Sequence, residues 1–240
     1  MTSTLDLMRP PAQRPRRRGW AGVLLVVALA VGLGAPVWID ARAAARYPVT
    51  AADLAAGYDA LDGLAVKGRA PRTGYDRDAF GQAWADVDRN GCDTRNDMLH
   101  RDLVDITVKP GSRGCVVLTG TLDDPYTATT IAFERGERSA EVQIDHVVAL
   151  ADAWQKGARG WTREVRTAFA NDPANLQAVD GPTNQSKGAG DAATWLPPNR
   201  GYRCVYALRQ VTVKAAYGLW VTQAEHDALE RELGRCVVSP

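Results

Sequence analysis

Residues 19–39 form a run of 21 residues without a charged side chain, directly after a cluster of arginines that ends at Arg18. At about 1.5 Å per residue, a helix of this length crosses a hydrocarbon layer of about 30 Å. The run also suits a secretory signal peptide, since small residues such as Ala41 and Ala43 follow it. The sequence therefore predicts a membrane anchor or a signal peptide. In either case residues 1–18 form a cytoplasmic basic tail and the rest of the chain is exported, either membrane-anchored or secreted.

The charge of the chain is uneven along its length. The first 45 residues hold six of the 29 basic residues and two of the 28 acidic ones, which leaves 23 basic and 26 acidic residues after them. A net charge of −3 in that part excludes nucleic-acid binding by bulk positive charge alone. Any chemistry on phosphate groups must therefore come from a local cluster of side chains or from a metal ion.

Four cysteines lie in the exported part, and no two of them form a CxxC pair. They are Cys92, Cys115, Cys204 and Cys236. An even number at these spacings favours disulfides in an oxidising compartment over a zinc ribbon. Three pairings are possible, and we expect Cys92–Cys115 and Cys204–Cys236 because each of these pairs closes a local loop.

Periodic patterns predict an α+β domain preceded by a linker. Residues 51–66 have the spacing of a short amphipathic helix with Thr50 as its cap, and we expect this helix to be a spacer. It lies within a linker over residues 40–74. The Gly-, Pro- and Arg-rich stretch 67–74 marks the boundary of the main domain, which extends over residues 75–240.

The main domain mixes short strands with short helices, and a Pro-Gly turn between two strand-like runs predicts a β-hairpin. The predicted strands cover residues 104–109, 115–122, 129–133, 142–144 and 176–179. The predicted helices cover residues 78–84, 93–103, 147–156, 162–169, 181–187, 202–217 and 224–233.

Residues suited to catalysis gather in the middle of this domain. Asp145 and His146 stand at the end of a predicted strand, Asn175 precedes the next strand, and Asn184 and Lys187 follow it. This D-H, N-L-Q and N-x-x-K-G pattern resembles the HNH (His-Me finger) nucleases, whose core is a ββα-metal motif. The closer resemblance is to the HNH-type domain at the C-terminus of GmrSD restriction endonucleases and its exported actinobacterial relatives. Further segments that carry it are NGCDTRNDML (residues 90–99), DPYT (124–127) and WLPPN (195–199).

The resemblance implies a metal-dependent endonuclease that hydrolyses phosphodiester bonds of nucleic acid, with DNA favoured over RNA. His146 would be the general base that takes a proton from water, with a rate that rises with pH around 6.5. Asp145 and Asn184 would bind one divalent metal, Mg²⁺ or Mn²⁺, since both offer hard oxygen ligands. Asn175 would orient the imidazole, and Lys187 would contact a phosphate.

Other features leave alternatives open. Asp93, Arg95 and Asn96 form a polar cluster beside Cys92 that either borders the site or caps a helix. The chain could also be a catalytically silent cell-envelope binding protein, or a phosphoesterase with a non-nucleic-acid substrate. Nucleic acid is the expected partner, a membrane is a second partner if residues 19–39 stay uncleaved, and the sequence indicates no protein partner.

Overall fold

The computed structural model describes residues 44–239, which belong to one compact unit that extends over residues 41–240. The predicted basic tail (1–18) and the uncharged run (19–39) lie outside the described residues. Within the described part, no helix has both the length and the apolar character needed to span a membrane. The choice between an anchor and a signal peptide therefore stays a prediction.

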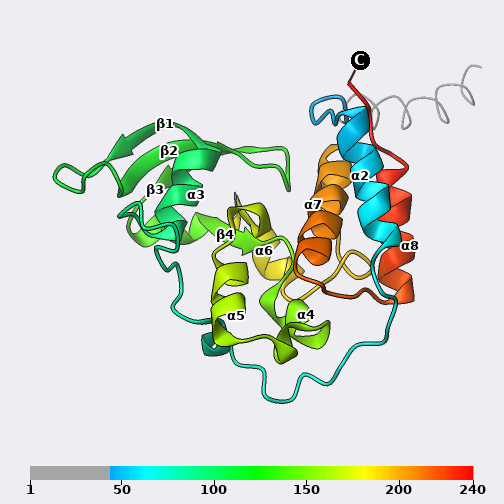
Figure 1. The fold of residues 1–240 in the computed structure, drawn as a ribbon. Coiled ribbons are helices and arrows are strands. Elements are labelled where there is room, and N and C mark those ends of the chain that lie inside the picture. The colour runs from blue at the N-terminus through cyan, green and yellow to red at the C-terminus, as the bar shows by residue number, and fades with distance from the viewer. Residues whose placement is uncertain (1–43, 240) are drawn as a thin grey trace, which may run out of the picture. The chain divides into compact units, whose positions relative to one another are not determined.

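The first sheet has three antiparallel strands in the order β1-β2-β3 (Figure 1). These strands are β1 (Leu103–Val108), β2 (Val117–Asp123) and β3 (Thr130–Glu134). Gly111 and Gly114 adopt φ angles of 75° and 82° in the turn between β1 and β2, a region that residues with a Cβ rarely enter. The predicted hairpin is therefore confirmed, and Leu103 pairs with Leu122 across it.

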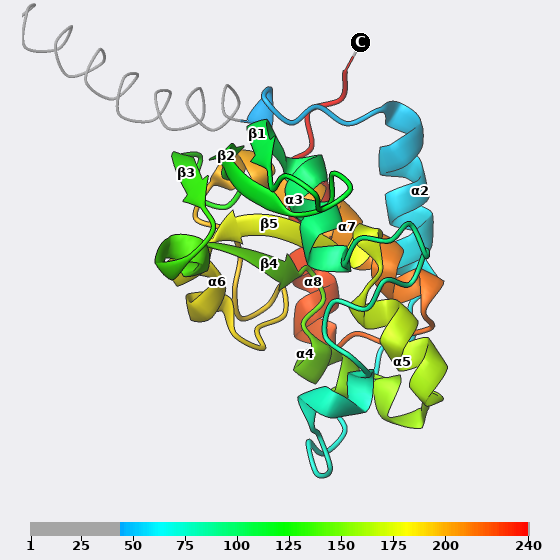
Figure 2. The ribbon, with the colours of Figure 1, turned by 90° about the vertical axis from the view of Figure 1, so that its left-hand side faces the viewer.

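The second sheet pairs β4 (Val142–His146) with β5 (Leu176–Asp180) in antiparallel register. His146 lies opposite Leu176, at the last pair of this ladder. Helix α6 (Gly181–Lys187) follows β5 directly and contacts both strands, as Figure 2 shows. The end of β4 is thus held by a neighbouring strand and a helix that come about thirty residues later in the chain.

The connection between these two strands holds the helices α4 (Leu150–Gln155) and α5 (Arg163–Ala170). We expected a helix from residue 147, but α4 begins only at Leu150. The backbone amides of Val147 and Val148 donate to the backbone and side-chain oxygens of Asn175, at 2.7 and 2.8 Å. These tertiary hydrogen bonds hold the two residues out of the helix.

Three helices that are distant in sequence pack together: α2 (Ala51–Asp62), α7 (Arg203–Ala216) and α8 (Gln223–Leu233). Leu61 of α2 is fully buried among them, and Gly57 lets Leu208 approach so closely that a Cβ at position 57 would clash with it. The expectation of a spacer helix in a linker over residues 40–74 was therefore wrong. The apolar face of α2 is covered by α7 and α8, which makes α2 part of the core.

Residues 67–84 follow α2 in the chain and end well before the first strand, which begins at Leu103. The predicted helix over 78–84 is only a single 3₁₀ turn at Arg77–Phe80. Gly81 ends this turn with a φ of 86°, and a Cβ there would clash with Thr167 of α5. The close approach to α5 thus ends the helix early.

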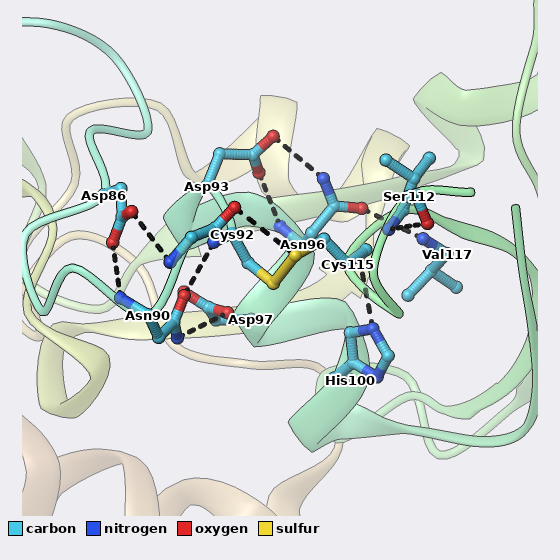
Figure 3. The surroundings of a disulfide bond; sticks show 12 residues. Asp86, Asn90, Cys92, Asp93, Asn96, Asp97, His100, Ser112, Cys115 and Val117 are labelled. Carbon is cyan, nitrogen blue, oxygen red and sulfur yellow. Dashed lines mark hydrogen bonds between the residues drawn. A yellow bond between two sulfur atoms is a disulfide. The ribbon is translucent and has the colours of Figure 1, made fainter.

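Both predicted disulfides are present, and no free cysteine occurs in residues 44–239. Cys92–Cys115 joins the start of helix α3 (Thr94–Asp102) to the chain just before β2, as Figure 3 shows. Cys204–Cys236 joins the start of α7 to the chain after α8. Each bond therefore closes a local loop, as the sequence predicted.

A group of buried opposite charges, which we call the ionic core, joins the end of α4 to α7 and α8. Lys156 Nζ lies 2.6 Å from carboxylate oxygens of both Asp152 and Glu225, and 2.8 Å from Asp191. Lys214 Nζ lies 3.0 Å from Asp152 and 2.9 Å from Glu225. All five side chains are at most 1% exposed. Such burial of charge is tolerable only because every charge has partners of the opposite sign.

Candidate active site

Strand β4 ends at Asp145 and His146, whose side chains reach a hollow of about 340 Å³. Both residues are largely buried, at 5% and 7% exposure. Asn184 of α6 lines the same hollow, because α6 lies beside β4 and β5. The structure therefore brings together three of the residues that the sequence assigned to one site.

Asp145 is held by two buried donors. Lys187 Nζ lies 2.7 Å from each of its carboxylate oxygens, and the Tyr126 hydroxyl donates to Oδ2 at 2.6 Å. Lys187 Nζ also donates to the backbone oxygen of His146 at 2.6 Å. An ammonium has three protons, so these contacts use all of them. The expected phosphate contact by Lys187 was therefore wrong for this structure, because its side chain is 0% exposed and its donors are occupied.

Burial also sets the protonation of these partners. Burial lowers the pKa of Lys187, and the adjacent Asp145 carboxylate opposes this by stabilising the ammonium. Burial and the same carboxylate raise the pKa of Tyr126 well above its ordinary value. Tyr126 therefore stays a neutral phenol that can donate to Asp145.

The His146 ring has one occupied and one open nitrogen. Nε2 lies 2.9 Å from the backbone oxygen of Ala170, and because a carbonyl only accepts, Nε2 must carry the proton. Nδ1 then has a free lone pair, and no residue within 44–239 forms a hydrogen bond to it. Burial lowers the pKa of His146 to about 4, although the bond to Ala170 and the charge of Asp145 oppose it. The ring is therefore a neutral base near pH 7.

Asn175 does not orient this ring. Its side-chain oxygen accepts from the Val148 amide at 2.8 Å, and its Nδ2 donates to the Val148 carbonyl at 3.3 Å. The expectation that Asn175 orients the imidazole was therefore wrong in this structure, because its side chain bonds to the Val148 backbone. Asn175 fixes the backbone just after His146, whereas the Ala170 carbonyl fixes the ring itself.

The oxygen donors at the hollow suit a divalent ion of the Mg²⁺ type. Asn184 Nδ2 donates to Gln143 Oε1 at 3.0 Å, which leaves the Asn184 amide oxygen available as a ligand. Asp145 oxygens keep lone pairs beside their present contacts. In the described part of the chain, no group of three or more His, Cys, Asp or Glu side chains could hold a metal by itself. The fit is to an ion held by two protein oxygens and completed by water and substrate.

A second, smaller hollow of about 70 Å³ is also lined by His146. The Trp84 ring stacks on the imidazole there, with centroids 6.0 Å apart and an interplanar angle of 14°. Arg77 and Leu150 line both hollows. His146 thus lines both a polar hollow and a smaller one whose lining includes the aromatic side chains of Phe80 and Trp84.

The polar cluster beside Cys92 caps a helix and does not line either hollow. Asp93 accepts from the backbone amide of Asn96 at 2.8 Å and caps α3, as Figure 3 shows. The Asn96 side-chain oxygen binds the Val117 amide at 3.1 Å, and Arg95 lies over the Phe133 ring at 5.8 Å. Of the two alternatives for Asp93, Arg95 and Asn96, the structure supports the helix cap, and none of the three lines either hollow.

Sequence reasoning missed several residues around the site. Tyr126 stands in the DPYT segment, which contributed to the family resemblance but carried no assigned role. Trp84, Arg72 and Arg77 belong to residues 67–84, which we treated as a boundary and a short helix. The arginines could have been assigned to the site only if their distance from the predicted phosphate site were known. The sequence does not give that distance.

The stretch from Asp86 into the first turn of α3 has a regular spacing of acidic and amide side chains. Asp86, Asp88, Asn90 and Gly91 stand at positions 1, 3, 5 and 6 of a twelve-residue stretch with the spacing of EF-hand calcium loops, and Asp97 stands at position 12, where that pattern has Glu. Hydrogen bonds within this stretch hold it together. Asn90 Nδ2 donates to carboxylate oxygens of Asp88 and Asp97, both at 3.1 Å. Burial and the neighbouring carboxylates raise the pKa of Asp97, although the bond from Asn90 opposes them.

The mixed helix-and-sheet fold, with a His at the end of one strand of a β-β-α succession, is consistent with an HNH-type domain. The family "GmrSD restriction endonucleases, C-terminal domain" matches residues 93–232, which is more than half of the chain. An "Uncharacterized secreted protein" of Arthroderma benhamiae is 39% identical over 178 residues, covering 73% of this chain and 82% of that protein. No solved structure matches the chain. The chain therefore belongs to the family of GmrSD restriction endonuclease C-terminal domains, as its motifs indicated.

Proposed function

We propose that the protein is an exported endonuclease that hydrolyses phosphodiester bonds of nucleic acid with the help of one divalent metal. The observation that carries this proposal is a neutral His146 with an open Nδ1, beside two oxygen donors in one hollow. Membership of a family described as restriction endonucleases supports nucleic acid as the substrate, and DNA before RNA. Export is supported by the two disulfides and by a relative described as secreted.

His146 is the general base in this proposal. Its Nδ1 accepts a proton from a water in the hollow, and the bond from Nε2 to Ala170 holds the ring and its tautomer in place. Since the ring is already neutral near pH 7, no proton has to leave it before it can act. Trp84 covers one face of the ring and limits its rotation.

Asp145 and Asn184 would hold the ion, with Mg²⁺ or Mn²⁺ preferred because both donors are hard oxygens. When bound, the ion supplies positive charge to the non-bridging phosphate oxygens and to the departing oxygen. Lys187 and Tyr126 keep the Asp145 carboxylate oriented toward the hollow. The Asn175 side chain holds the backbone that follows His146.

The decisive experiment compares plasmid cleavage by the purified protein and by His146→Ala in Mg²⁺. Loss of a general base lowers turnover by about 10² to 10⁴. His226→Ala is the matched control, because His226 lies in α8 outside both hollows. Equal cleavage by the protein and His146→Ala would refute the assignment. No cleavage by the native protein in Mg²⁺ or Mn²⁺ would favour a silent binding protein or a different phosphoesterase.

The metal is tested separately from catalysis. Asn184→Ala removes one ligand without disturbing the buried ion pair of Asp145 and Lys187, so its fold should be intact. We expect weaker binding of Mn²⁺, measured by electron paramagnetic resonance of the free ion. Gln143→Ala is a useful comparison, since Gln143 binds the Asn184 amide nitrogen and is not a proposed ligand. Cleavage that survives EDTA would rule out the metal.

A further inference from the structure

Residues 67–84 contribute to the lining of the larger hollow, and several contacts hold them against the rest of the domain. Arg69 binds two carboxylates of the ionic core, Asp152 at 2.9 Å and Asp191 at 2.5 Å. The backbone amide of Ala70 donates to the Gln155 carbonyl at 2.9 Å. In Figure 1 this segment is the trace that leaves α2 and passes α4 before a short turn beside α5. The segment is thus held against α4, although it has almost no regular secondary structure.

Aromatic packing fixes the middle of the segment. The Tyr75 ring meets Trp154 of α4 with centroids 6.0 Å apart, and meets Phe80 at 6.4 Å. The Arg166 side chain donates to the Ala79 carbonyl at 2.8 Å. The backbone on both sides of Arg77 is therefore anchored to α4 and α5.

Two arginines of this anchored segment line the hollow that holds Asp145, His146 and Asn184. Arg72 and Arg77 are both exposed, and within residues 44–239 neither guanidinium has a carboxylate at ion-pair distance. Arg72 lies over the Tyr75 ring, 4.9 Å from its centroid, which steadies the guanidinium and leaves its N–H groups free.

The two acidic residues of the same segment, Asp76 and Asp78, form no ion pair with these arginines. Asp76 uses Oδ1 to accept from the Asp78 amide at 2.9 Å and caps the 3₁₀ turn. Asp78 lines only the small hollow, together with Arg77. The larger, polar hollow is therefore lined by two guanidinium groups without ion-pair partners in the described part of the chain. By contrast, Lys187 of the N-x-x-K-G motif is fully buried and paired with Asp145.

We propose that Arg72 and Arg77 bind phosphate groups of a nucleic-acid strand in this hollow, so that a segment outside the family-matched residues 93–232 completes the site. This inference rests on the proposed function for its choice of nucleic acid. A guanidinium presents paired N–H donors that fit the oxygens of a phosphate, and charge-assisted bonds of this kind are strong. The local pair also explains how a domain of net negative charge can hold a polyanion.

The test measures DNA binding without cleavage. The protein carrying His146→Ala is titrated against a fluorescein-labelled DNA duplex by fluorescence anisotropy, at several salt concentrations. Arg72→Gln and Arg77→Gln are added singly and together, and Arg113→Gln is the control. Arg113 is an exposed arginine in the turn between β1 and β2, away from both hollows.

Each of the two site variants should weaken binding about tenfold and reduce the slope of log K against log salt by about 1, because one phosphate contact is lost. Arg77→Lys should restore the salt slope, since the charge returns. If Arg72→Gln and Arg77→Gln bind like Arg113→Gln, or if the His146→Ala protein binds no DNA, the inference is overturned.

Failure of the proposed function gives a different result. If the native protein cleaves no nucleic acid but its DNA binding depends on Arg72 and Arg77, the arginine assignment stands and the nuclease proposal falls. If the native protein cleaves DNA while both arginine variants bind normally, the nuclease proposal stands and the arginine assignment falls.

Discussion

The burial of His146 changes the pH dependence expected of a histidine base. Because the pKa is lowered to about 4, the ring becomes neutral as the pH rises through about 4 and stays neutral above it. The activity that depends on this base should therefore be level between about pH 6 and 8, in place of the rise around 6.5 that the sequence predicted. Measurements of kcat/KM across this range check this, and a rise centred near 6.5 would contradict it.

Lys187 is expected to act on stability and not on substrate binding. Lys187→Met leaves the buried Asp145 carboxylate without its cation, which costs about 3 to 5 kcal/mol of unfolding free energy. Urea unfolding followed by circular dichroism measures this. Lys109→Met is the control, because Lys109 is exposed in the turn after β1. Unchanged unfolding together with weakened DNA binding would show that Lys187 contacts phosphate after all.

The resemblance to HNH nucleases allowed a grouping of Asp145, His146 and Asn184, because it assigned the D-H and N-x-x-K-G segments to one site although α6 follows β4 only after two α-helices and a strand. The partners of Lys187 and Asn175 could not be predicted. A lysine offers three donors to any anion or carbonyl, and only the tertiary fold decides between a carboxylate and a phosphate.

Helix α4 is joined to α7 and α8 by the ionic core, and acid should lower the stability that this core provides. Burial alone would raise the pKa of Asp152, but Lys214 and Lys156 outweigh it and lower the pKa to about 2. The unfolded chain, with an ordinary pKa of 3.8, therefore takes up the proton first as the pH falls. The stability from this carboxylate, roughly 2 kcal/mol, is complete above about pH 4 and is lost between about 4 and 2.

Urea unfolding at a series of pH values measures this loss. Asp152→Asn should be less stable near neutral pH, because Lys156 and Lys214 lose a carboxylate, and its stability should decline less steeply in acid. An equally steep decline in Asp152→Asn would assign the acid sensitivity to other groups.

Helices whose apolar residues recur with helical period were predicted well from the sequence. Helix α7 was expected over 202–217 and is found at Arg203–Ala216, since its apolar positions recur with helical period. The role of α2 was missed, because an amphipathic helix shows the same pattern whether it is a spacer or part of a core. Its partners lie about 150 residues later, beyond the reach of local pattern.

For the molecule as a whole, the two disulfides should account for a large share of the stability. Cys204–Cys236 closes a loop with a sequence separation of 32, which the chain-entropy estimate values at roughly 3 to 4 kcal/mol. The double variant Cys204→Ala/Cys236→Ala should therefore melt at a lower temperature in differential scanning calorimetry. Alkylation of the unreduced protein, followed by mass spectrometry, should find no free thiol, and modified cysteines would contradict the pairing.

The pairing of β4 with β5 across a connection of about thirty residues means that the site can form only once these two strands have met. Closing such loops costs entropy before any native contact can offset it. The bond of His146 to Ala170 and that of Asp145 to Lys187 join residues 24 and 42 positions apart, so neither exists until the connection has folded. A chain that crosses a membrane unfolded therefore has no assembled site during its passage, and the site first appears on the side where folding is completed.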